Sequence, residues 1–505
     1  MIVYTPEILD QVKDILNIGI ALSAEKNHNR LLEMIVTEAR RITNADAGTL
    51  YLCDGNSLVF KIVQNETQQS FFGGDGQPVA LPPVPMKLEN VSSYVALTCQ
   101  TVNIPNVYEA EGFDFSGPKN YDKITGYRTV SMLVIPLQNH ESEVIGVLQL
   151  INAQDDFGNP IAFPPYVEKV ISSLASQAAI SLTNMQLLRD IENLFNSFVE
   201  VMATAIDSRT PYNANHTRRV ALLAVKLAEA VNEFREGAWS QEYFDEERLA
   251  QLLMAGWLHD IGKISTPLTV MNKATRIEGR IEIVLQRLDY IMANLKSQYL
   301  QNKLEQIEKG NYDSLPGIEE RWLKEYSLVQ EARDLIIKAD NPATYVNKNI
   351  LEQLNDIAQR TYVDQDGFEH KWLNEEELTG LSVEKGTLTA CERQIMEDHV
   401  LITQRLLDKI PFTRKLKDVP WFAVIHHEHL NGKGYPFGLK GDEIPIEGRI
   451  LALVDIFDAL TAADRPYKKA LPVEKSLEIL GFMVKDGDLD ADLLQIFLDK
   501  KVWER

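Results

Sequence analysis

The sequence is poor in cysteine and has no long hydrophobic runs. Cys53, Cys99 and Cys391 lie far apart and follow no zinc-binding spacing, which is typical of a reducing compartment without disulfides. We expect all three in the core. No stretch of about 18 apolar residues occurs, and the amino terminus lacks a basic segment followed by an apolar one. The sequence therefore predicts a cytoplasmic protein with no membrane span.

Positive charge is also scarce. The 51 Lys and Arg residues are outnumbered by 73 Asp and Glu, which gives a net charge of −22 over 505 residues. A nucleic-acid polymer would be repelled by this charge, so we exclude it as a partner, and a small anionic substrate must meet locally placed Lys and Arg. The length predicts a multidomain protein of about three domains.

Segment 1–165 has the pattern of a small α+β domain. Apolar residues at helical spacing over 6–42 predict two amphipathic helices. Strand signals follow at 47–52, 57–63, 130–137 and 144–151. The first two flank Asp54-Gly55-Asn56, a sequence typical of a hairpin turn. Helices around a largely antiparallel sheet predict a sensor-like domain.

Two stretches of this segment, 131–137 and 145–152, resemble a GAF domain, and the resemblance covers about residues 8–185. Cyclic-nucleotide-binding GAF domains carry a motif that this sequence matches at Asn152, Phe163 and Glu168. It departs from that motif at Ala153 and Val167, where the family has Lys and Asp. A small-molecule ligand and a ligand-free, dimerising GAF domain therefore both stay open.

Segment 166–207 is predicted to be one long connecting helix, because no Pro or Gly occurs between Pro165 and Pro211. Its apolar residues recur at steps of three and four, close to a coiled-coil seam. They are Ile171, Leu174, Ala178, Met185, Leu188, Ile191, Phe195, Phe198 and Met202. We expect a parallel homodimer through this helix; the alternative is a helix that folds back on its own domain.

Histidine and aspartate are concentrated in the remaining sequence. Five of the nine His residues accompany two Asp residues in apolar helical surroundings: His216, His259, Asp260, His399, His426, His427 and Asp455. One such His is usually a core residue, but seven such groups are difficult to explain separately. Mixed imidazole and carboxylate ligands suit iron, manganese, nickel or zinc, with iron or manganese favoured for an octahedral pair. We expect two divalent metal ions.

The stretches 259–263, 426–439, 455–461 and 465–468 identify this region as similar to the HD-GYP phosphodiesterases. The resemblance implies an all-α catalytic domain in two parts, 208–275 and 387–505. It implies that the seven residues above are metal ligands and that Asp260 bridges the metals. It assigns substrate binding and phosphate contacts to Lys263, Gly434, Tyr435, Pro436, Arg465 and Lys468. Asp260 and Lys263 would be the catalytic residues.

The activity that the resemblance implies is hydrolysis of cyclic di-GMP to linear pGpG, GMP or both, under regulation by the GAF domain. A metal pair activates a water molecule and neutralises charge on the phosphodiester. Lys263 lies one turn from Asp260, where it can meet a phosphate oxygen. The alternatives are another cyclic nucleotide (cGAMP, cAMP or cGMP) as the substrate, or a non-catalytic module that binds cyclic di-GMP in signalling.

Three features depart from the family pattern. Tyr212 stands where some members carry a Glu that binds a third metal, and Asn431 replaces the usual Asp. The largest departure is an insertion over 276–386, whose apolar spacing predicts two or three antiparallel helices. This insertion could be a lid, a dimer contact, a docking arm or a scaffold.

Overall fold

The computed structural model describes residues 6–209, 215–234, 237–462 and 470–504. The chain forms two compact units, Met1–Phe195 and Asn196–Arg505. Among the described helices, none combines the length and the hydropathy that crossing a lipid bilayer requires.

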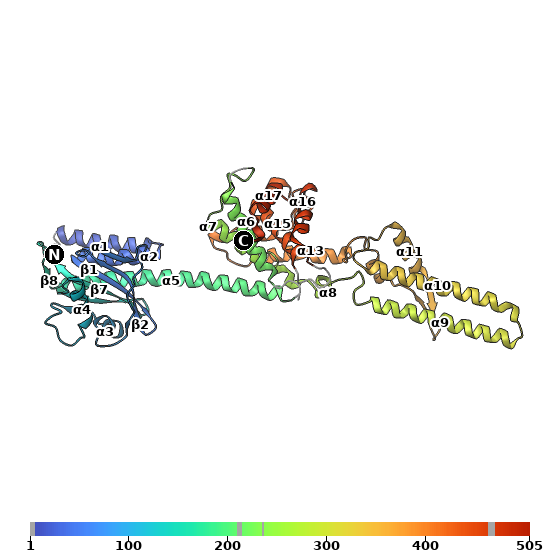
Figure 1. The fold of residues 1–505 in the computed structure, drawn as a ribbon, viewed down its shortest axis with the longest axis horizontal. Helices are drawn as coiled ribbons and strands as arrows, with labels where there is room; N and C mark the ends of the chain where they lie inside the picture. Colours follow the sequence, from blue (N-terminus) through green and yellow to red (C-terminus); the bar gives the residue numbers. More distant parts are fainter. Residues whose placement is uncertain (1–5, 210–214, 235–236, 463–469, 505) are drawn as a thin grey trace, which may run out of the picture. The chain divides into compact units, whose positions relative to one another are not determined.

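The first unit is built on one antiparallel sheet with the strand order β3-β2-β1-β7-β6-β5 (Figure 1). Its strands are β1 (Ala45–Asp54), β2 (Ser57–Asn65), β3 (Ser70–Gly73), β4 (Val84–Pro85), β5 (Val102–Ile104), β6 (Met132–Gln138), β7 (Val144–Gln154) and β8 (Pro160–Ile161). β4 pairs with β2, and β8 pairs with β7. The four predicted strands and the hairpin between β1 and β2 are confirmed, because β1 pairs with β2 from Ala47↔Asn65 to Asp54↔Ser57.

Helices cover both faces of this sheet (Figure 1). They are α1 (Pro6–Ala24), α2 (His28–Thr43), α3 (Val91–Thr98), α4 (Ser116–Thr125) and the beginning of α5 (Pro165–Asp207). Leu31 and Ile35 of α2 are fully buried against Leu50 and Leu148 of the sheet. A second apolar cluster, which includes Val95 of α3, fills the other face. The two amphipathic helices predicted over 6–42 are therefore confirmed.

Asn152, one of the residues that match the nucleotide-binding motif, has a structural role here. Its Oδ1 accepts the N–H groups of Val130 and Ser131 at 2.7 and 3.2 Å, while its Nδ2 donates to the Arg128 carbonyl at 2.8 Å. Its backbone has φ 54°, in the left-handed region that Asn tolerates. These contacts hold the segment that enters β6. Hydrogen bonds within the domain therefore account for an Asn at position 152 without a bound nucleotide.

Helix α5 contains 43 residues, as the absence of Pro and Gly predicts. The first half of its apolar seam, including Ile171, Leu174 and Ala178, is buried in the core of the first unit. The second half is in contact with solvent: Leu188 and Ile191 are 64% and 61% exposed. The long helix is confirmed. The homodimer stays a prediction, in which the exposed half of the seam would form the contact between the two chains.

The second unit is helical around its buried histidines. Its elements outside the insertion are α6 (His216–Glu233), α7 (Glu246–Leu258), η1 (Ile261–Ser265), α8 (Leu268–Met271), α13 (Ala390–Leu407), η3 (Arg414–Leu416), α14 (Val419–Val424), η4 (Gly441–Glu443), α15 (Ile446–Thr461), α16 (Val473–Lys485), α17 (Ala491–Asp499) and η5 (Val502–Glu504). No strand occurs among their described residues. Among these elements, helices α6 and α15 contribute the most buried apolar side chains.

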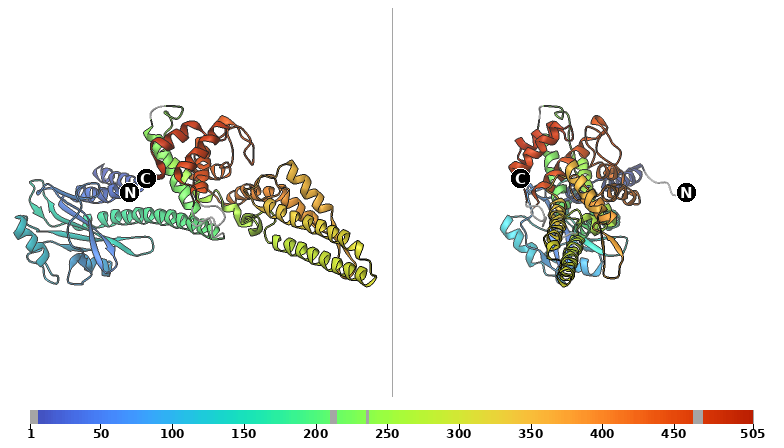
Figure 2. Two further views of the ribbon diagram at one scale, coloured as in Figure 1. Left: turned by 45° about the vertical axis from the view of Figure 1, so that its right-hand side comes forward. Right: turned by 90° about the vertical axis from the view of Figure 1, so that its right-hand side faces the viewer.

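The insertion has more elements than the sequence predicts. It contains α9 (Ile281–Glu308), η2 (Tyr312–Ser314), α10 (Leu315–Asp340), α11 (Lys348–Gln359), β9 (Thr361–Val363), β10 (Glu369–Lys371) and α12 (Glu375–Leu381). Figure 2 shows α9 and α10 side by side as a long helical hairpin. The prediction of two or three helices was therefore wrong: α12 and the β9–β10 ribbon close the base of the hairpin, where Trp372 and Leu381 join its core.

Arg276 fastens the base of the insertion. Its side chain is fully buried, and its guanidinium donates to five backbone carbonyls at 2.6 to 3.3 Å, those of Ala339, Asn341, Thr344, Val383 and Glu384. Three of these carbonyls come from the end of α10 and the connection to α11, and two come from the end of the inserted segment. A buried charge is tolerated only when its donors are satisfied, so Arg276 joins the start of the insertion to its end.

The cysteine prediction was wrong in part. All three thiols are free, as expected, but Cys53 and Cys99 are only half-buried and Cys391 is exposed. Cys391 follows the first residue of α13, on the solvent side of that helix. Cys391 thus lies in the same helix as the buried His399 but on its exposed side.

Candidate metal centre

The seven predicted ligands come from five separate segments, and the second unit brings them together. His216 begins α6, His259 directly follows α7, His399 lies within α13, and His426 and His427 follow α14. Asp260 precedes η1, and Asp455 lies in α15. The side chains of His216, His259 and Asp260 form one cluster, and those of His399, His426 and His427 form another.

Asp260 lies between the two clusters, with one carboxylate oxygen toward each. Its Oδ2 is 3.3 Å from His259 Nε2 and 3.7 Å from His216 Nε2. Its Oδ1 is 3.3 Å from His399 Nε2. Each oxygen thus faces a different set of imidazoles, and the bridging role of Asp260 stays a prediction.

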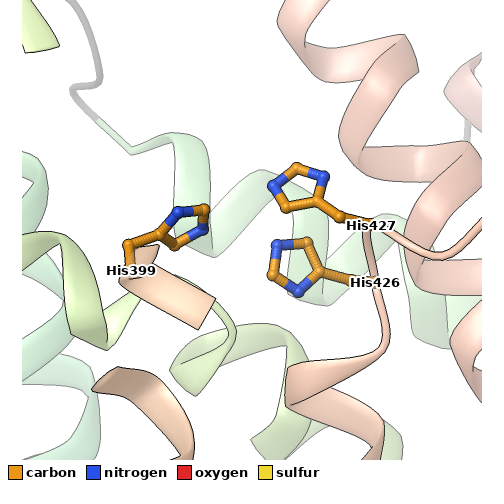
Figure 3. Close-up of side chains that lie close together, drawn as sticks. All are labelled: His399, His426 and His427. Carbon is orange, nitrogen blue, oxygen red and sulfur yellow. The ribbon is translucent and has the colours of Figure 1, made fainter. Parts of the chain in front are cut away.

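Asp455 completes the first cluster. Its Oδ1 lies 3.1 Å from His216 Nε2 and 3.9 Å from His259 Nε2. The other cluster is made of imidazoles alone, and Figure 3 shows the rings of His399, His426 and His427 directed toward a common space. One ligand atom from each of His216, His259 and Asp260 lies within 4.8 Å of the others, and the same holds for His399, His426 and His427.

The imidazoles are oriented by backbone carbonyls. In His259, His399 and His426, Nδ1 lies 2.8, 2.5 and 2.7 Å from the carbonyl oxygen three residues earlier. A carbonyl can only accept, so Nδ1 carries the proton and Nε2 keeps a free lone pair. This arrangement is typical of histidines that bind a metal through Nε2.

Four buried atoms of this site have no hydrogen-bond partner among the residues that the structure describes: Nε2 of His259, His399 and His426, and Oδ1 of Asp260. Burying a polar atom without a partner is costly, and native structures contain few such atoms. All four are atoms that a cation would bind. The residues therefore fit divalent metal ions, although the donor set does not distinguish iron, manganese, nickel and zinc.

Asp458 was not assigned a role from the sequence, yet it supports the first cluster. It is almost fully buried, and its Oδ2 accepts from His216 Nδ1 at 2.7 Å. Its Oδ1 also accepts from Arg219 Nε at 2.6 Å. The available signal was its spacing of three residues after Asp455, which places both carboxylates on one side of α15.

The protonation equilibria of the two clusters differ. Burial disfavours the charged form of His216, but the carboxylates of Asp260, Asp455 and Asp458 raise its pKa well above the ordinary value. Burial lowers the pKa of His427 to about 3. Burial and the neighbouring imidazoles hold the pKa of His426 well below its usual range. The pKa of His216 is thus shifted in the opposite direction from the pKa values of His426 and His427.

Lys263 contacts the site through an ion pair with Asp260. Its Nζ lies 2.5 Å from Asp260 Oδ2, and its side chain is 20% exposed. Burial would raise the pKa of Asp260, but Lys263 and His259 hold that pKa well below its usual value. Lys263 follows Asp260 on a 3-10 turn, as its spacing predicts, and forms an ion pair with the carboxylate.

Thr403 and Gly262 shape the turn that carries Asp260 and Lys263. Thr403 of α13 accepts the Gly262 N–H at 3.0 Å and donates to the His259 carbonyl at 3.1 Å. A Cβ at Gly262 would lie 1.9 Å from the His399 carbonyl oxygen. Only glycine fits there, because the segment that carries His259 and Asp260 packs directly against α13, the helix of His399.

Residues 432–439 form a tight loop beside His427. A Cβ at Gly434 would lie 2.3 Å from the backbone nitrogen of His429, which excludes any larger residue. Tyr435 places its ring centroid 4.8 Å from that of His427. The buried carboxylate of Glu428, which had no role assigned from the sequence, accepts the N–H groups of Phe437 and Leu439 at 2.7 and 2.9 Å.

Of the other predicted substrate contacts, Pro436 lies in this loop, whereas Arg465 and Lys468 fall outside the described residues, as does Tyr212. Asn431, the residue that replaces the usual Asp, donates to Asp488 Oδ1 at 2.8 Å. That contact ties the loop to the segment before α17.

Comparison with known families supports two kinds of domain. A GAF-domain model matches residues 27–182. Two HD-domain models match residues 213–307 and 376–493, which together contain all seven candidate ligands.

Several characterised relatives are similar to part of the chain. The 3′3′-cGAMP-specific phosphodiesterase 3 of Vibrio cholerae is 43% identical over 96 residues, which are 19% of this chain and 20% of the relative. The cyclic di-GMP phosphodiesterase response regulator RpfG of Xanthomonas campestris is 42% identical over 95 residues, or 19% and 25% of the two chains. A cyclic di-GMP phosphodiesterase of Thermotoga maritima is 42% identical over 93 residues, or 18% and 24%. This chain thus spans about a quarter or less of these relatives.

Proposed function

We propose that this chain, which joins a GAF domain to an HD domain of the HD-GYP type, is a metal-dependent phosphodiesterase that hydrolyses a cyclic dinucleotide. The observation that carries this proposal is the pair of buried clusters that share Asp260, with unpartnered Nε2 atoms directed inward. Such a site suits hydrolysis of a phosphodiester without a Ser or Cys nucleophile.

The metal ligands in this proposal are the seven residues of the two clusters. His216, His259 and Asp455 would hold one ion, His399, His426 and His427 the other, and Asp260 would bind to both. Divalent metals bound there supply a water of lowered pKa and neutralise charge on the phosphodiester. Iron or manganese is the favoured choice, with nickel or zinc as alternatives.

The chain's own residues would orient the substrate. Lys263 is close enough to Asp260 to exchange that contact for a non-bridging phosphate oxygen when metals neutralise the carboxylate. Arg465 and Lys468 are proposed to hold further phosphate oxygens. Gly434, Tyr435 and Pro436 would border the substrate because their loop packs against His427.

The proposed substrate is cyclic di-GMP, with linear pGpG, GMP or both as products. A second candidate is 3′3′-cGAMP, since a relative that is named specific for it is as similar to this chain as those named for cyclic di-GMP. Cyclic AMP and cyclic GMP are less favoured. A non-catalytic signalling module would not need the complete set of ligand atoms.

We retain the domain boundaries predicted from the sequence as part of the proposal. The sensor domain covers 1–165, the connecting helix 166–207, and the catalytic domain 208–275 and 387–505 around the insertion 276–386. A homodimer would form along the exposed half of α5. A monomer in solution at micromolar concentration, measured by light scattering, would contradict that assembly.

Regulation by the GAF domain would act through the end of α5. Asp207, its last residue, accepts from the Thr217 hydroxyl at 2.6 Å, next to His216. Arg209 donates to the Lys263 carbonyl at 2.6 Å. A displacement of this helix end would thus be transmitted to both ligand segments. A small molecule bound to the GAF domain is the proposed source of that displacement.

The test is product analysis after the purified protein, loaded anaerobically with iron or manganese, is incubated with cyclic di-GMP, 3′3′-cGAMP, cyclic AMP and cyclic GMP. Loss of a cyclic dinucleotide with a linear product supports the proposal. Loss of a cyclic mononucleotide alone would keep the metal centre and refute the substrate. Absence of turnover with metal demonstrably bound would refute the enzyme and favour the signalling module.

A further inference from the structure

Next to the metal centre, two large aromatic side chains are left in contact with solvent. Trp421 and Phe437 are 40% and 43% exposed. Their ring centroids lie 5.5 Å apart, and the ring planes are inclined by 27°, so the two rings are stacked. Aromatic rings normally gain free energy by burial, and an exposed stacked pair keeps surface available for a further flat group.

The backbone holds Phe437 in place before any ligand binds. Its N–H donates to Glu428 Oε1 at 2.7 Å, and the next N–H groups, of Gly438 and Leu439, donate to the same carboxylate at 3.2 and 2.9 Å. Glu428 is only 2% exposed. Trp421 is held by α14, whose neighbouring Phe422 and Ala423 are buried. A preorganised surface of this kind binds a ligand with little loss of conformational freedom.

The stacked pair borders the histidines of the metal centre. Phe437 follows Tyr435 by two residues, a separation of at most about 7 Å along the chain. The Tyr435 N–H donates to the His427 carbonyl at 3.2 Å, and the two rings are in contact. Trp421 lies on the helix that leads directly to His426. A substrate held at the imidazole cluster therefore has these rings within reach.

We propose that Trp421 and Phe437 form a stacking platform for a purine base of the substrate, which rests on the proposed function. In a cyclic dinucleotide each phosphodiester joins the two nucleosides, so one base lies on each side of the bond that is hydrolysed. When one base lies beside the histidine clusters, the other base would rest on a surface outside them. Stacking on an aromatic face requires no positive charge, which suits a chain with a net charge of −22.

The experiment compares wild-type full-length protein, loaded with manganese, with W421A, F437A and the ring-preserving variant W421F. The matched control is Y243A, which removes another exposed aromatic ring, 64% exposed, from the same unit. Substrates are cyclic di-GMP, 3′3′-cGAMP, cyclic GMP and methyl p-nitrophenyl phosphate, which carries no base. Thermal unfolding of each variant reports whether the fold is retained.

For W421A we expect the KM for both cyclic dinucleotides to rise about tenfold, since stacking of one base is worth that much or more, while kcat stays within about twofold. F437A should act in the same direction, and W421F and Y243A should resemble the wild type. Turnover of methyl p-nitrophenyl phosphate should be unchanged. An unchanged KM for the dinucleotides in W421A overturns the platform, as does an equal rise for cyclic GMP, which has no second base.

A failure of the proposed function is distinguishable from a failure of the platform. If the wild type hydrolyses no cyclic nucleotide, the enzyme proposal is wrong, and the platform is then tested by equilibrium dialysis with labelled cyclic di-GMP. A dissociation constant about tenfold higher in W421A than in Y243A supports the platform. Equal dissociation constants, or no binding to the wild type, overturn it.

Discussion

Replacement of Asp458 by Asn should weaken one metal site and leave the other intact. The Asp458 carboxylate accepts from His216 Nδ1 at 2.7 Å and from Arg219 Nε and Nη2 at 2.6 and 3.0 Å. Asn keeps the shape and one acceptor oxygen but removes the negative charge. Its amide nitrogen must then face the donors of His216 or of Arg219, so at least one contact becomes unfavourable.

The magnitude follows from the kind of contact that is lost. Groups that orient a ligating histidine typically contribute a factor of about 10 to 100 to metal affinity. Since Asn retains one acceptor, we expect the lower limit: a tenfold loss, or about 1.4 kcal/mol, at the cluster of His216, His259 and Asp455. D458A, which removes both oxygens, should lose about a hundredfold.

The assay is competition of the protein with a chromophoric chelator for manganese or zinc, which resolves two sites of different affinity. D458N should weaken one of the two binding steps and leave the other unchanged, because His399, His426 and His427 do not contact Asp458. D499N, a change at an exposed carboxylate of α17, is the matched control. Equal affinities in D458N and the wild type for both steps would refute the role of Asp458.

Three further predictions address the bridge, the protons and the insertion. D260N should fold but lose turnover by at least about a hundredfold, because neither cluster retains the shared charge. Turnover by D260N at the rate of the wild type would contradict the bridging role of Asp260. Because the pKa of His216 is raised well above its ordinary value, we expect His216 to hold a proton at neutral pH when no metal is bound. A metal ion must displace that proton. Metal affinity at the cluster of His216 should therefore rise by up to about tenfold per pH unit until the pH reaches this pKa. Calorimetry in buffers of different ionisation enthalpy should detect the released proton, whereas His427, with a pKa of about 3, should release none. R276M should lower the free energy of unfolding by about 3 kcal/mol or more, since five buried carbonyls lose a charged donor; an unchanged midpoint in urea, followed by circular dichroism, would show that the insertion does not depend on this residue.

The sequence by itself determined the order of domains and the elements that have strong local patterns. The predicted fold class is confirmed: an α+β GAF domain on an antiparallel sheet, a long helix, and a helical HD region with an inserted segment. Apolar periodicity identifies helices and strands because each element buries one face. The 43-residue helix α5 follows directly from the lack of Pro and Gly.

Local pattern was insufficient inside the insertion. The β9–β10 ribbon consists of two three-residue strands, and both are mostly exposed. Such strands have no apolar alternation that a sequence could reveal. The role of Arg276 was equally hidden, because a single Arg before a helix carries no sign of the five carbonyls that later chain segments bring to it.

At the metal centre, the sequence supplied the residue types, and only the tertiary structure decided how they combine. Imidazoles from α6, α7, α13 and the end of α14 come together through packing between helices that are distant in sequence. The division into two clusters, the placement of one Asp260 oxygen toward each, and the support from Asp458 depend on that packing. Spacing along a chain specifies neighbours on one helix, whereas a site built from five segments is specified only when their hydrophobic faces are buried against one another.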